Sequence, residues 1–455
     1  MRKRAILALM LVVALAVTTS CSLIVKDAEV DKQTVIIEAA GKTFTKEEVK
    51  TELSQALDYQ EYVYGMYGYP FDKTDAKTIA EAQDNVIKGL IDRAVTDQKK
   101  TELGFDTFTD EELAQMQAEV DETWDGYVKS ITSGYFADTK LTGDELTKAI
   151  DAKMVEVGYG SKDTMLESQK TVKANEKLRA DVVKDVAVTD DEVKAEYDSR
   201  VAAAMANYAN DVSAYGSDVQ NGATVYYVPA GYRYVKNILR KFSEEDATKI
   251  SGFTTQITDK QTQLGNVTSS LAELGEDATA DDELTAQKRA DLTKTKATLD
   301  AELADLQTQL DAAKETAYAA LQPTVDEILA KLAQSTDFDA LIAEYGEDPG
   351  MQNEPGKTTG YPVCLGSTSW VAEFTDAAMA LEKIGDVSSA VRSSYGIHFI
   401  QYTGDAAEGA VAFDTVKDTV QSELLTKKQD EQYTATVAQW ATDAHAKIYI
   451  DRMAD

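Results

Sequence analysis

The stretch WVAEFTDAAMALEKIGDVSSAVRSSYGIHFIQYTGD, residues 370–405, combines one short helical pattern with two strand patterns. Residues 374–381 have the spacing of a helix, whereas residues 387–391 and 398–402 are rich in strand-forming side chains. Gly396 stands between the two strands, as expected of a turn. This order of elements predicts a small α/β domain.

Residues upstream extend this domain. FDALIAEY, residues 338–345, predicts a second helix, and a loop rich in glycine and proline follows at residues 346–366. Pro323 is expected to begin a helix, because proline is well tolerated in a first helical turn. YRYVKNILR, residues 232–240, alternates in the manner of a strand. We place the domain at residues 226–410.

Two segments within this domain carry a seven-residue repeat of apolar side chains. The repeat positions are Ile250, Ile257, Leu264 and Leu271 in the first segment and Leu292, Leu299 and Leu306 in the second. Neither stripe has another surface to bury against, so we expect an antiparallel coiled-coil arm at residues 246–318, about 45 Å long. Dimerisation through the same stripes is the alternative.

The chain before the domain, residues 21–225, is mostly helical in pattern. Three Thr-x-x-Glu capping boxes mark helix starts at Thr45, Thr109 and Thr189. Residues 201–229, rich in tyrosine, alanine and glycine, are predicted to form the junction with the α/β domain.

The first twenty residues have the layout of a secretory signal. Basic residues 2–4 precede an apolar run at residues 5–17, and small residues lead into Cys21. The run is shorter than the roughly 20 residues of a transmembrane helix. A small residue directly before Cys21 resembles the bacterial lipobox, so we expect cleavage after residue 20 and a lipid on Cys21, with a plain cleaved signal as the alternative.

Composition excludes several classes of function. The chain has 46 Lys and Arg against 79 Asp and Glu, a net charge of −33, which argues against a nucleic-acid partner. Two cysteines and two histidines are too few for most metal sites, and no metal is expected. Cys364 is expected to be a buried small hydrophobic residue rather than a nucleophile.

A resemblance to a known family rests on the 337–404 segment. It keeps nearly all of the pattern F-x-x-A-A-x-x-L-x-x-G-x-V-S-x-x-V-(R/K)-(S/T)-x-(F/Y)-G-x-H, with one extra residue between Leu381 and Gly385. This pattern resembles the parvulin-type peptidyl-prolyl cis-trans isomerase domain. YRYVKNILRKF, residues 232–242, resembles the first parvulin strand, which makes the arm an insertion in the domain.

Together with the lipobox, the domain resembles the PrsA foldase lipoproteins and the related chaperone SurA. The resemblance implies a predominantly helical α+β fold, in which the N-terminal segment and residues 411–455 form one helical chaperone module. Within 411–455 we expect a long amphipathic helix at residues 413–447 and a strand at residues 448–450.

The chemistry of such a domain requires neither a cofactor nor a covalent step. Rotation about an X-Pro bond is opposed by a barrier of roughly 18–20 kcal/mol from amide resonance. An apolar slot that holds the proline ring and favours the twisted amide lowers that barrier. The resemblance implies that Phe374 and Trp370 line this slot with Pro362 on the adjoining loop. It places Asp348 and His398 beneath the amide.

One residue departs from the family pattern. The family usually has a histidine in its first strand, where this chain has Asn237. Asparagine forms hydrogen bonds but does not titrate near neutral pH. Asn237 therefore either preserves the hydrogen-bond geometry beside His398 or accompanies a domain that binds without turnover.

The sequence thus predicts an extracytoplasmic foldase, anchored by lipid to a bacterial membrane, that isomerises X-Pro bonds in newly exported or unfolded proteins. The alternatives are a catalytically silent holdase and an adaptor that acts through the arm, and a homodimer stays open. A tyrosine-rich stretch with one methionine has two interpretations, a groove for unfolded clients or ordinary core packing: Tyr59, Tyr62, Tyr64, Met66, Tyr67 and Tyr69.

Overall fold

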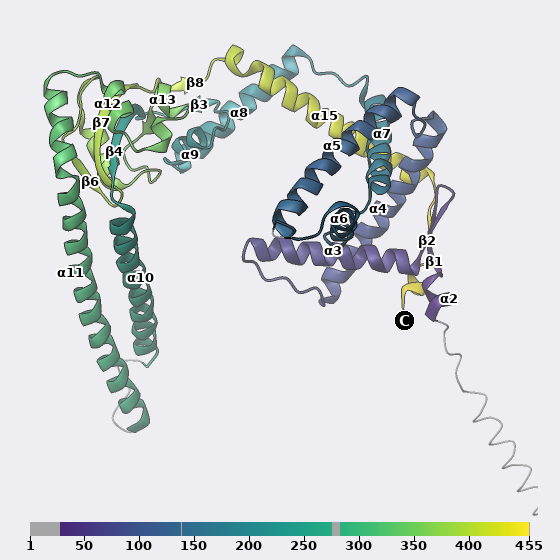
Figure 1. Cartoon of the computed structure of the whole chain (residues 1–455), viewed down its shortest axis with the longest axis horizontal. Coiled ribbons are helices and arrows are strands. Elements are labelled where there is room, and N and C mark those ends of the chain that lie inside the picture. The colour runs from purple at the N-terminus through teal and green to yellow at the C-terminus, as the bar shows by residue number, and fades with distance from the viewer. Residues whose placement is uncertain (1–27, 138, 275–282, 455) are drawn as a thin grey trace, which may run out of the picture. The chain divides into compact units, whose positions relative to one another are not determined.

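The computed structural model describes residues 28–137, 139–274 and 283–454 (Figure 1). The chain forms two compact units. One contains residues up to Val188 together with residues from Glu423 onward, and the other spans Thr189–Ser422. The predicted signal, residues 1–20, and Cys21 lie outside the described residues. Among the helices that are described, none combines the length and the apolar character needed to cross a membrane.

The first unit is mainly helical, with one small sheet. All three Thr-x-x-Glu capping boxes are formed, the third of them at the start of the second unit. The helices of the first unit are α2 (Ala28–Lys32), α3 (Lys46–Met66), α4 (Ala76–Leu103), α5 (Asp110–Tyr135), α6 (Gly143–Glu156), α7 (Lys162–Val183) and the part of α15 (Phe413–Asp443) that begins at Glu423. The sheet has the order β2 (Lys42–Thr45), β1 (Val35–Ala39), β9 (Lys447–Ile448).

The two ends of the chain are joined in this unit, as the fold class predicted. Strand β9 pairs antiparallel with β1, so that Ile37 faces Ile448. The ammonium group of Lys46 is buried and donates to Asp31 Oδ2 and to the Ala454 carbonyl, each at 2.8 Å. The strand is shorter than expected and gives way to a 3-10 turn, η2 (Ile450–Met453).

The second unit is built on a four-stranded antiparallel sheet of order β5-β4-β7-β6. The strands are β4 (Arg233–Lys241), β5 (Tyr361–Val363), β6 (Val391–Ser393) and β7 (Gly396–Asp405), and a separate ribbon pairs β3 (Tyr227–Val228) with β8 (Gly409–Ala410). The helices are α8 (Asp190–Asn210), α9 (Ala214–Gln220), α10 (Glu244–Glu273), α11 (Glu283–Ala333), α12 (Phe338–Tyr345), α13 (Gly356–Thr359) and α14 (Ala372–Ala380), with a 3-10 turn η1 (Pro349–Met351). The molecule is therefore α+β and predominantly helical, as predicted.

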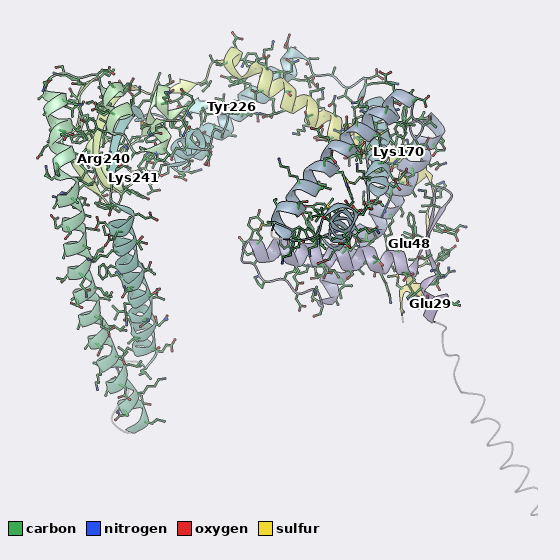
Figure 2. All side chains as sticks on the ribbon, viewed as in Figure 1. Glu29, Glu48, Lys170, Tyr226, Arg240 and Lys241 are labelled. Carbon is green, nitrogen blue, oxygen red and sulfur yellow. The ribbon has the colours of Figure 1, made fainter. Side chains whose placement is uncertain are left out.

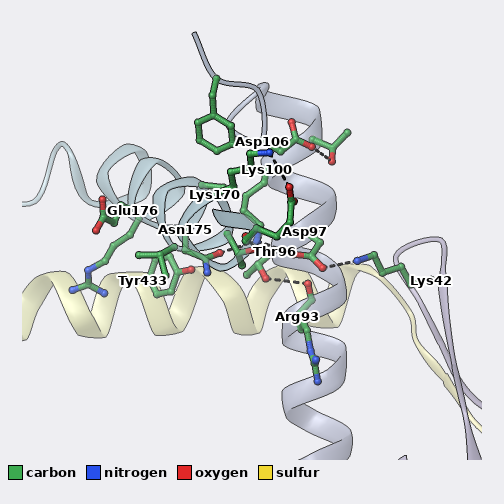
Figure 3. Close-up of a pocket in the computed structure, with 17 residues that line it drawn as sticks. Lys42, Arg93, Thr96, Asp97, Lys100, Asp106, Lys170, Asn175, Glu176 and Tyr433 are labelled. Atoms are coloured by element: carbon green, nitrogen blue, oxygen red, sulfur yellow. Dashed lines mark hydrogen bonds and ion pairs between the residues drawn. The ribbon is translucent and has the colours of Figure 1, made fainter. Parts of the chain in front are cut away.

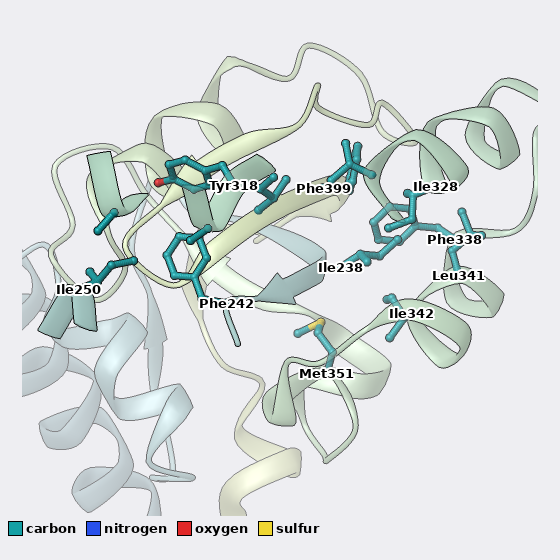
Figure 4. Close-up of a cluster of buried hydrophobic side chains, with 14 of the residues drawn as sticks. Ile238, Phe242, Ile250, Tyr318, Ile328, Phe338, Leu341, Ile342, Met351 and Phe399 are labelled. Carbon is teal, nitrogen blue, oxygen red and sulfur yellow. The ribbon is translucent and has the colours of Figure 1, made fainter. Parts of the chain in front are cut away.

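The central pair β4 and β7 has two different faces. Asn237 faces Ile400 and Leu239 faces His398 across the pair, so these four side chains share one face. The intervening residues Ile238, Ile397 and Phe399 point to the other face and are almost fully buried. There they pack against α11 and α12 through apolar residues that include Ile328, Phe338 and Leu341 (Figure 4).

The predicted arm is present as an antiparallel helical hairpin. Near its base, Ile250 of α10 packs in the same cluster as Leu310 of α11. Farther along, Lys260 forms an ion pair with Glu302 at 2.6 Å, and near the tip Arg289 donates to the Leu274 carbonyl at 3.2 Å. The heptad residues are the buried or half-buried ones on both helices. The segment that joins the helices lies outside the described residues, and supercoiling of the pair stays a prediction.

Two local expectations were wrong. Pro323 lies inside α11 rather than at a helix start. The helix continues because Tyr318 before it and Val325 after it are buried in one cluster, and this packing outweighs the loss of one hydrogen bond. Strand pairing from Val387 is limited to a single bridge with Gln401, and β6 begins only at Val391.

Residues 201–229, predicted to form the junction with the α/β domain, contain the end of one helix and the whole of another. Helix α8 runs to Asn210 and α9 follows it. Tyr208, Tyr215 and Tyr232 pack edge to face and are almost fully buried, so these helices belong to the core of the second unit. The compact unit begins at Thr189, and the limit of the isomerase domain at residue 226 stays a prediction.

The tight connection from β6 to β7 depends on Gly396. Its φ angle is +144°, and a Cβ atom there would lie 2.0 Å from the Arg240 carbonyl oxygen. Arg240 and Lys241 end β4 at this point, where the chain leaves for α10 (Figure 2). Any side chain at residue 396 would therefore push β7 away from β4.

We predict that Gly396→Ala lowers the free energy of unfolding of the second unit by about 3 kcal/mol. The matched control is Gly404→Ala in the same strand, where a Cβ meets no atom within 4 Å, and its effect should stay below about 1 kcal/mol. Urea unfolding can be followed by Trp370 fluorescence after replacing Trp124 and Trp440 by Phe. Equal losses in the two variants would contradict the steric argument.

Candidate functional site

A cavity of about 590 Å³ opens on the face of β4 and β7 opposite the helices α11 and α12. The helix α14 and the segment from η1 to β5 complete its walls. It is lined by Asn237, Leu239, Lys241, Asp348, Pro349, Tyr361, Thr368, Ser369, Trp370, Val371, Phe374, Tyr395 and His398. Five of the six residues predicted for the site of chemistry and binding therefore line one cavity.

Pro362 is the predicted residue that does not line it. The proline is buried in β5, and its carbonyl oxygen accepts a hydrogen bond from Trp370 Nε1 at 3.1 Å. Its contribution in this structure is to fix the indole ring, rather than to offer its own ring to a ligand.

The polar floor of the cavity is a continuous chain of hydrogen bonds. His398 Nδ1 lies 3.2 Å from Asn237 Oδ1, and Asn237 Nδ2 donates to Asp348 Oδ2 at 2.8 Å. At the far end, the Tyr361 hydroxyl donates to Asp348 Oδ1 at 2.8 Å. At the near end, Ser393 Oγ lies 2.7 Å from His398 Nε2.

The directions of these bonds fix the tautomer of His398. Because the Asn237 amide donates to the carboxylate, its oxygen faces the imidazole and accepts from Nδ1–H. The Nε2 atom then carries the lone pair and accepts from the Ser393 hydroxyl, whose oxygen in turn accepts from the Tyr395 backbone N–H at 3.1 Å. Each polar group in this series of hydrogen bonds thus has a partner.

Burial keeps this imidazole neutral. His398 is only 5% exposed, and burial lowers its pKa from 6.5 to about 4, against the opposing influence of the Asp348 and Glu373 carboxylates. The unfolded chain binds a proton at this histidine more readily than the folded protein does. The stability that the neutral imidazole contributes is therefore fully present above about pH 6.5 and is lost as the pH falls toward about 4. Burial and the nearby Asp348 also raise the pKa of Tyr361, so its hydroxyl stays a donor.

Aromatic rings form the apolar side of the cavity. The centroids of Tyr361 and Trp370 are 4.1 Å apart, and those of Trp370 and Phe374 are 5.6 Å apart. Phe374 meets the His398 ring edge to face at 5.4 Å. An apolar ring entering the cavity would therefore rest on these aromatic surfaces while the atoms bonded to it face the polar floor.

Two residues of the floor were missed at the sequence level. Tyr361 was expected in an irregular loop, and Ser393 was treated only as part of the motif. A signal for Ser393 was available, because Gly396 makes the preceding strand fold back and places Ser393 beside β7. No comparable local signal marks Tyr361, whose position depends on the pairing of β5 with β4.

A second cavity, of about 890 Å³, lies in the first unit between α4, α7 and α15 (Figure 3). Its charged groups are paired with one another or with nearby side chains. The ammonium group of Lys100 is 2.7 Å from both Asp97 Oδ1 and Asn175 Oδ1, and Asp97 also pairs with Lys42. Asp97 thus joins α4 to β2, and Lys100 joins α4 to α7. Among residues that the structure describes, no group of three or more potential ligands could hold a metal ion.

Comparison with known proteins assigns the cavity to a class of domain. The family described as the PPIC-type PPIASE domain, that is, peptidyl-prolyl isomerase, matches residues 275–406. The match includes four of the lining residues named above as site residues, Asp348, Trp370, Phe374 and His398, but not β4 with Asn237. The predicted parvulin-type domain is confirmed.

About a quarter of this chain is similar to PrsA foldases, which confirms the predicted resemblance. It is 35% identical to the foldase protein PrsA of Geobacillus kaustophilus over 109 residues, covering 24% of this chain and 36% of the relative. It is 36% identical to foldase protein PrsA 4 of Bacillus cereus over 113 residues, covering 25% and 38%. The chain thus spans a little over a third of the length of these curated relatives.

A crystal structure of PrsA from Bacillus cereus aligns with 74% of this chain and 86% of its own, at 19% identity. Its TM-score of 0.20 is too low to establish a shared overall arrangement.

We predict that His398 titrates far below neutral pH. A His445→Gln variant leaves one imidazole in the chain, so its proton resonances can be followed without ambiguity. They should keep the shifts of the neutral ring down to about pH 5, and Asp348→Asn should lower the pKa further by removing a charge that favours imidazolium. A midpoint near the ordinary value in the folded protein would contradict the buried neutral tautomer.

Proposed function

We propose that this chain is an extracytoplasmic foldase that catalyses cis-trans isomerisation of X-Pro bonds in the 590 Å³ cavity. The observation that carries the proposal is the unbroken chain Ser393–His398–Asn237–Asp348–Tyr361 beneath an aromatic wall, in a PPIC-type domain. Its substrates would be unfolded or newly exported proteins that contain proline.

The aromatic wall would hold the substrate's proline ring. Trp370, Phe374 and Tyr361 present ring surface to the cavity, which removes water from one side of the bound amide. The planar amide is more polar than the twisted one because resonance separates charge between nitrogen and oxygen. Loss of water therefore disfavours the planar ground state relative to the twisted transition state.

The polar floor would act by position rather than by proton transfer. His398 is neutral at physiological pH, and Asn237 cannot titrate there. Both are held by buried hydrogen bonds, so their dipoles need little reorganisation while the substrate's carbonyl group rotates above them. In this account Asn237 preserves the geometry that the family usually builds with a histidine.

We predict that Asn237→Ala reduces kcat/KM for a proline-containing tetrapeptide by about tenfold to a hundredfold. The variant removes one hydrogen-bond partner from Asp348 and one from the buried His398, a loss of about 1–3 kcal/mol. Lys236→Ala is the matched control, since its side chain lies on the opposite face of the same strand and pairs with Asp339. Protease-coupled isomerisation by the full chain measures both, and no acceleration by the unaltered chain would refute the proposal.

A holdase without turnover is the second candidate, and Asn237 in the place of the family's histidine is the residue that favours it. For a holdase, suppression of aggregation of a denatured client should survive the double change Asp348→Ala and His398→Ala. For a foldase that depends on isomerisation, refolding of a client limited by proline isomerisation should slow in the same variant. Refolding yield and refolding rate of one client separate the two outcomes.

The location and partners belong to the same proposal. A signal at residues 1–20 and a lipid on Cys21 would hold the chain at the outer face of a bacterial cell membrane, with the chaperone module formed from residues 21–225 and 411–455. Mass spectrometry of the protein from its native membrane tests whether Cys21 carries a lipid. A mature N-terminus without a lipid would indicate an exported foldase that has no lipid anchor.

A further inference from the structure

The end of α3 and the loop after it carry an exposed aromatic patch. We call it the tyrosine patch, and it consists of Tyr59, Tyr62, Tyr64, Met66, Tyr67 and Tyr69. The exposed fractions of these side chains range from 46% for Tyr64 to 71% for Tyr67. The alternative that these residues form ordinary core is therefore wrong, and six large side chains in eleven residues face solvent.

Three residues of the patch form a second stripe on α3, whose first stripe is buried. Val49 and Leu57 face the interior of the unit and are at most 9% exposed. Tyr59, Tyr62 and Met66 follow at spacings of three and four on the outer side of the same helix. A soluble protein rarely leaves such a patch uncovered without a binding role.

The patch is held in place before anything binds. The backbone N–H of Tyr69 donates to the Tyr64 carbonyl at 2.9 Å, which turns the loop back along α3. Lys73 donates to Asp58 at 3.1 Å and to Glu61 at 2.8 Å, and the Tyr64 and Phe71 rings lie 5.1 Å apart. A preformed surface loses less entropy on binding than a mobile one.

The charges around the patch select its occupant. Within residues 58–75, which include the patch, there are four acidic residues, Asp58, Glu61, Asp72 and Asp75, and one basic residue, Lys73, which pairs with Asp58 and Glu61. Hydrogen bonds from Thr74 and Thr78 lower the pKa values of Asp72 and Asp75, so both stay ionised. An anionic lipid surface, or a second copy of a chain whose net charge is −33, would be repelled.

We propose that the tyrosine patch binds cationic, unfolded segments of client polypeptides in extended form, independently of proline. The proposal rests on the foldase function above and names the class of client segment that the first unit would hold. Lys and Arg would lay their aliphatic stems and charges over tyrosine rings while the acidic rim attracts them. The helix from Tyr59 to Met66 rises about 10 Å, which matches three or four residues of extended chain.

Fluorescence anisotropy of the full chain with proline-free peptides tests this. One labelled peptide of about twelve residues carries Lys among Leu, Ser and Gly, and its partner carries Glu at the same places. We expect the cationic peptide to bind at least about tenfold more tightly and to weaken several-fold between about 0.05 and 0.5 M salt. Because neither peptide contains proline, the result is independent of whether the isomerase proposal holds.

Variants locate the binding. Changing Tyr59, Tyr62 and Tyr67 together to Ser should weaken the cationic peptide at least about fivefold, whereas Tyr135→Ser, which is also exposed, should not. Equal binding of the two peptides, or a triple variant that binds like the unaltered chain, would overturn the proposal. Two other results would also overturn it. In both, the triple variant would still bind the peptide but would have lost either binding to phosphatidylcholine vesicles or a dimer seen by sedimentation velocity.

Discussion

The pairing register of β4 with β7 is the constraint on which the second unit depends. Because side chains alternate along a strand, one register sends Asn237 and His398 to the cavity and Ile238 and Phe399 to the helical core. A slip by one residue would bury the polar pair against α11 and α12 and expose the isoleucine and phenylalanine. Gly396 anchors that register, since its backbone passes where no side chain fits. The same contacts thus stabilise the fold and assemble the site.

The polar floor is stable in a buried position because it is complete. An imidazole, an amide, a carboxylate and two hydroxyls satisfy one another, so burial leaves no unpaired group among them. Replacing the family's usual first histidine by Asn237 retains a donor and an acceptor while removing one titratable group. The floor then contains one imidazole, that of His398, which burial keeps neutral at physiological pH.

Local chemistry explains what the sequence predicted well. The capping boxes at Thr45, Thr109 and Thr189, the helix at residues 338–345 and the seam of the arm are all determined by near neighbours along the chain. Pro323 and Tyr361 were misjudged because packing between distant segments decides their positions. The family resemblance located Asp348 and His398, and the resemblance of residues 232–242 to the first parvulin strand placed Asn237 with them; β4 lies beside β7 in the structure. Solvent exposure of the tyrosine patch likewise depends on which face of α3 the rest of its unit covers.

Helix α11 runs without interruption from the outer part of the arm into the core beneath the sheet. Its 51 residues correspond to about 76 Å of continuous rod. A lateral force at the tip would therefore be transmitted as torque to Ile328 and its neighbours behind β4 and β7, because no loop intervenes to absorb it. The arm therefore acts as a lever that pivots on the helix-covered face of the sheet, and thermal bending of the arm strains the sheet.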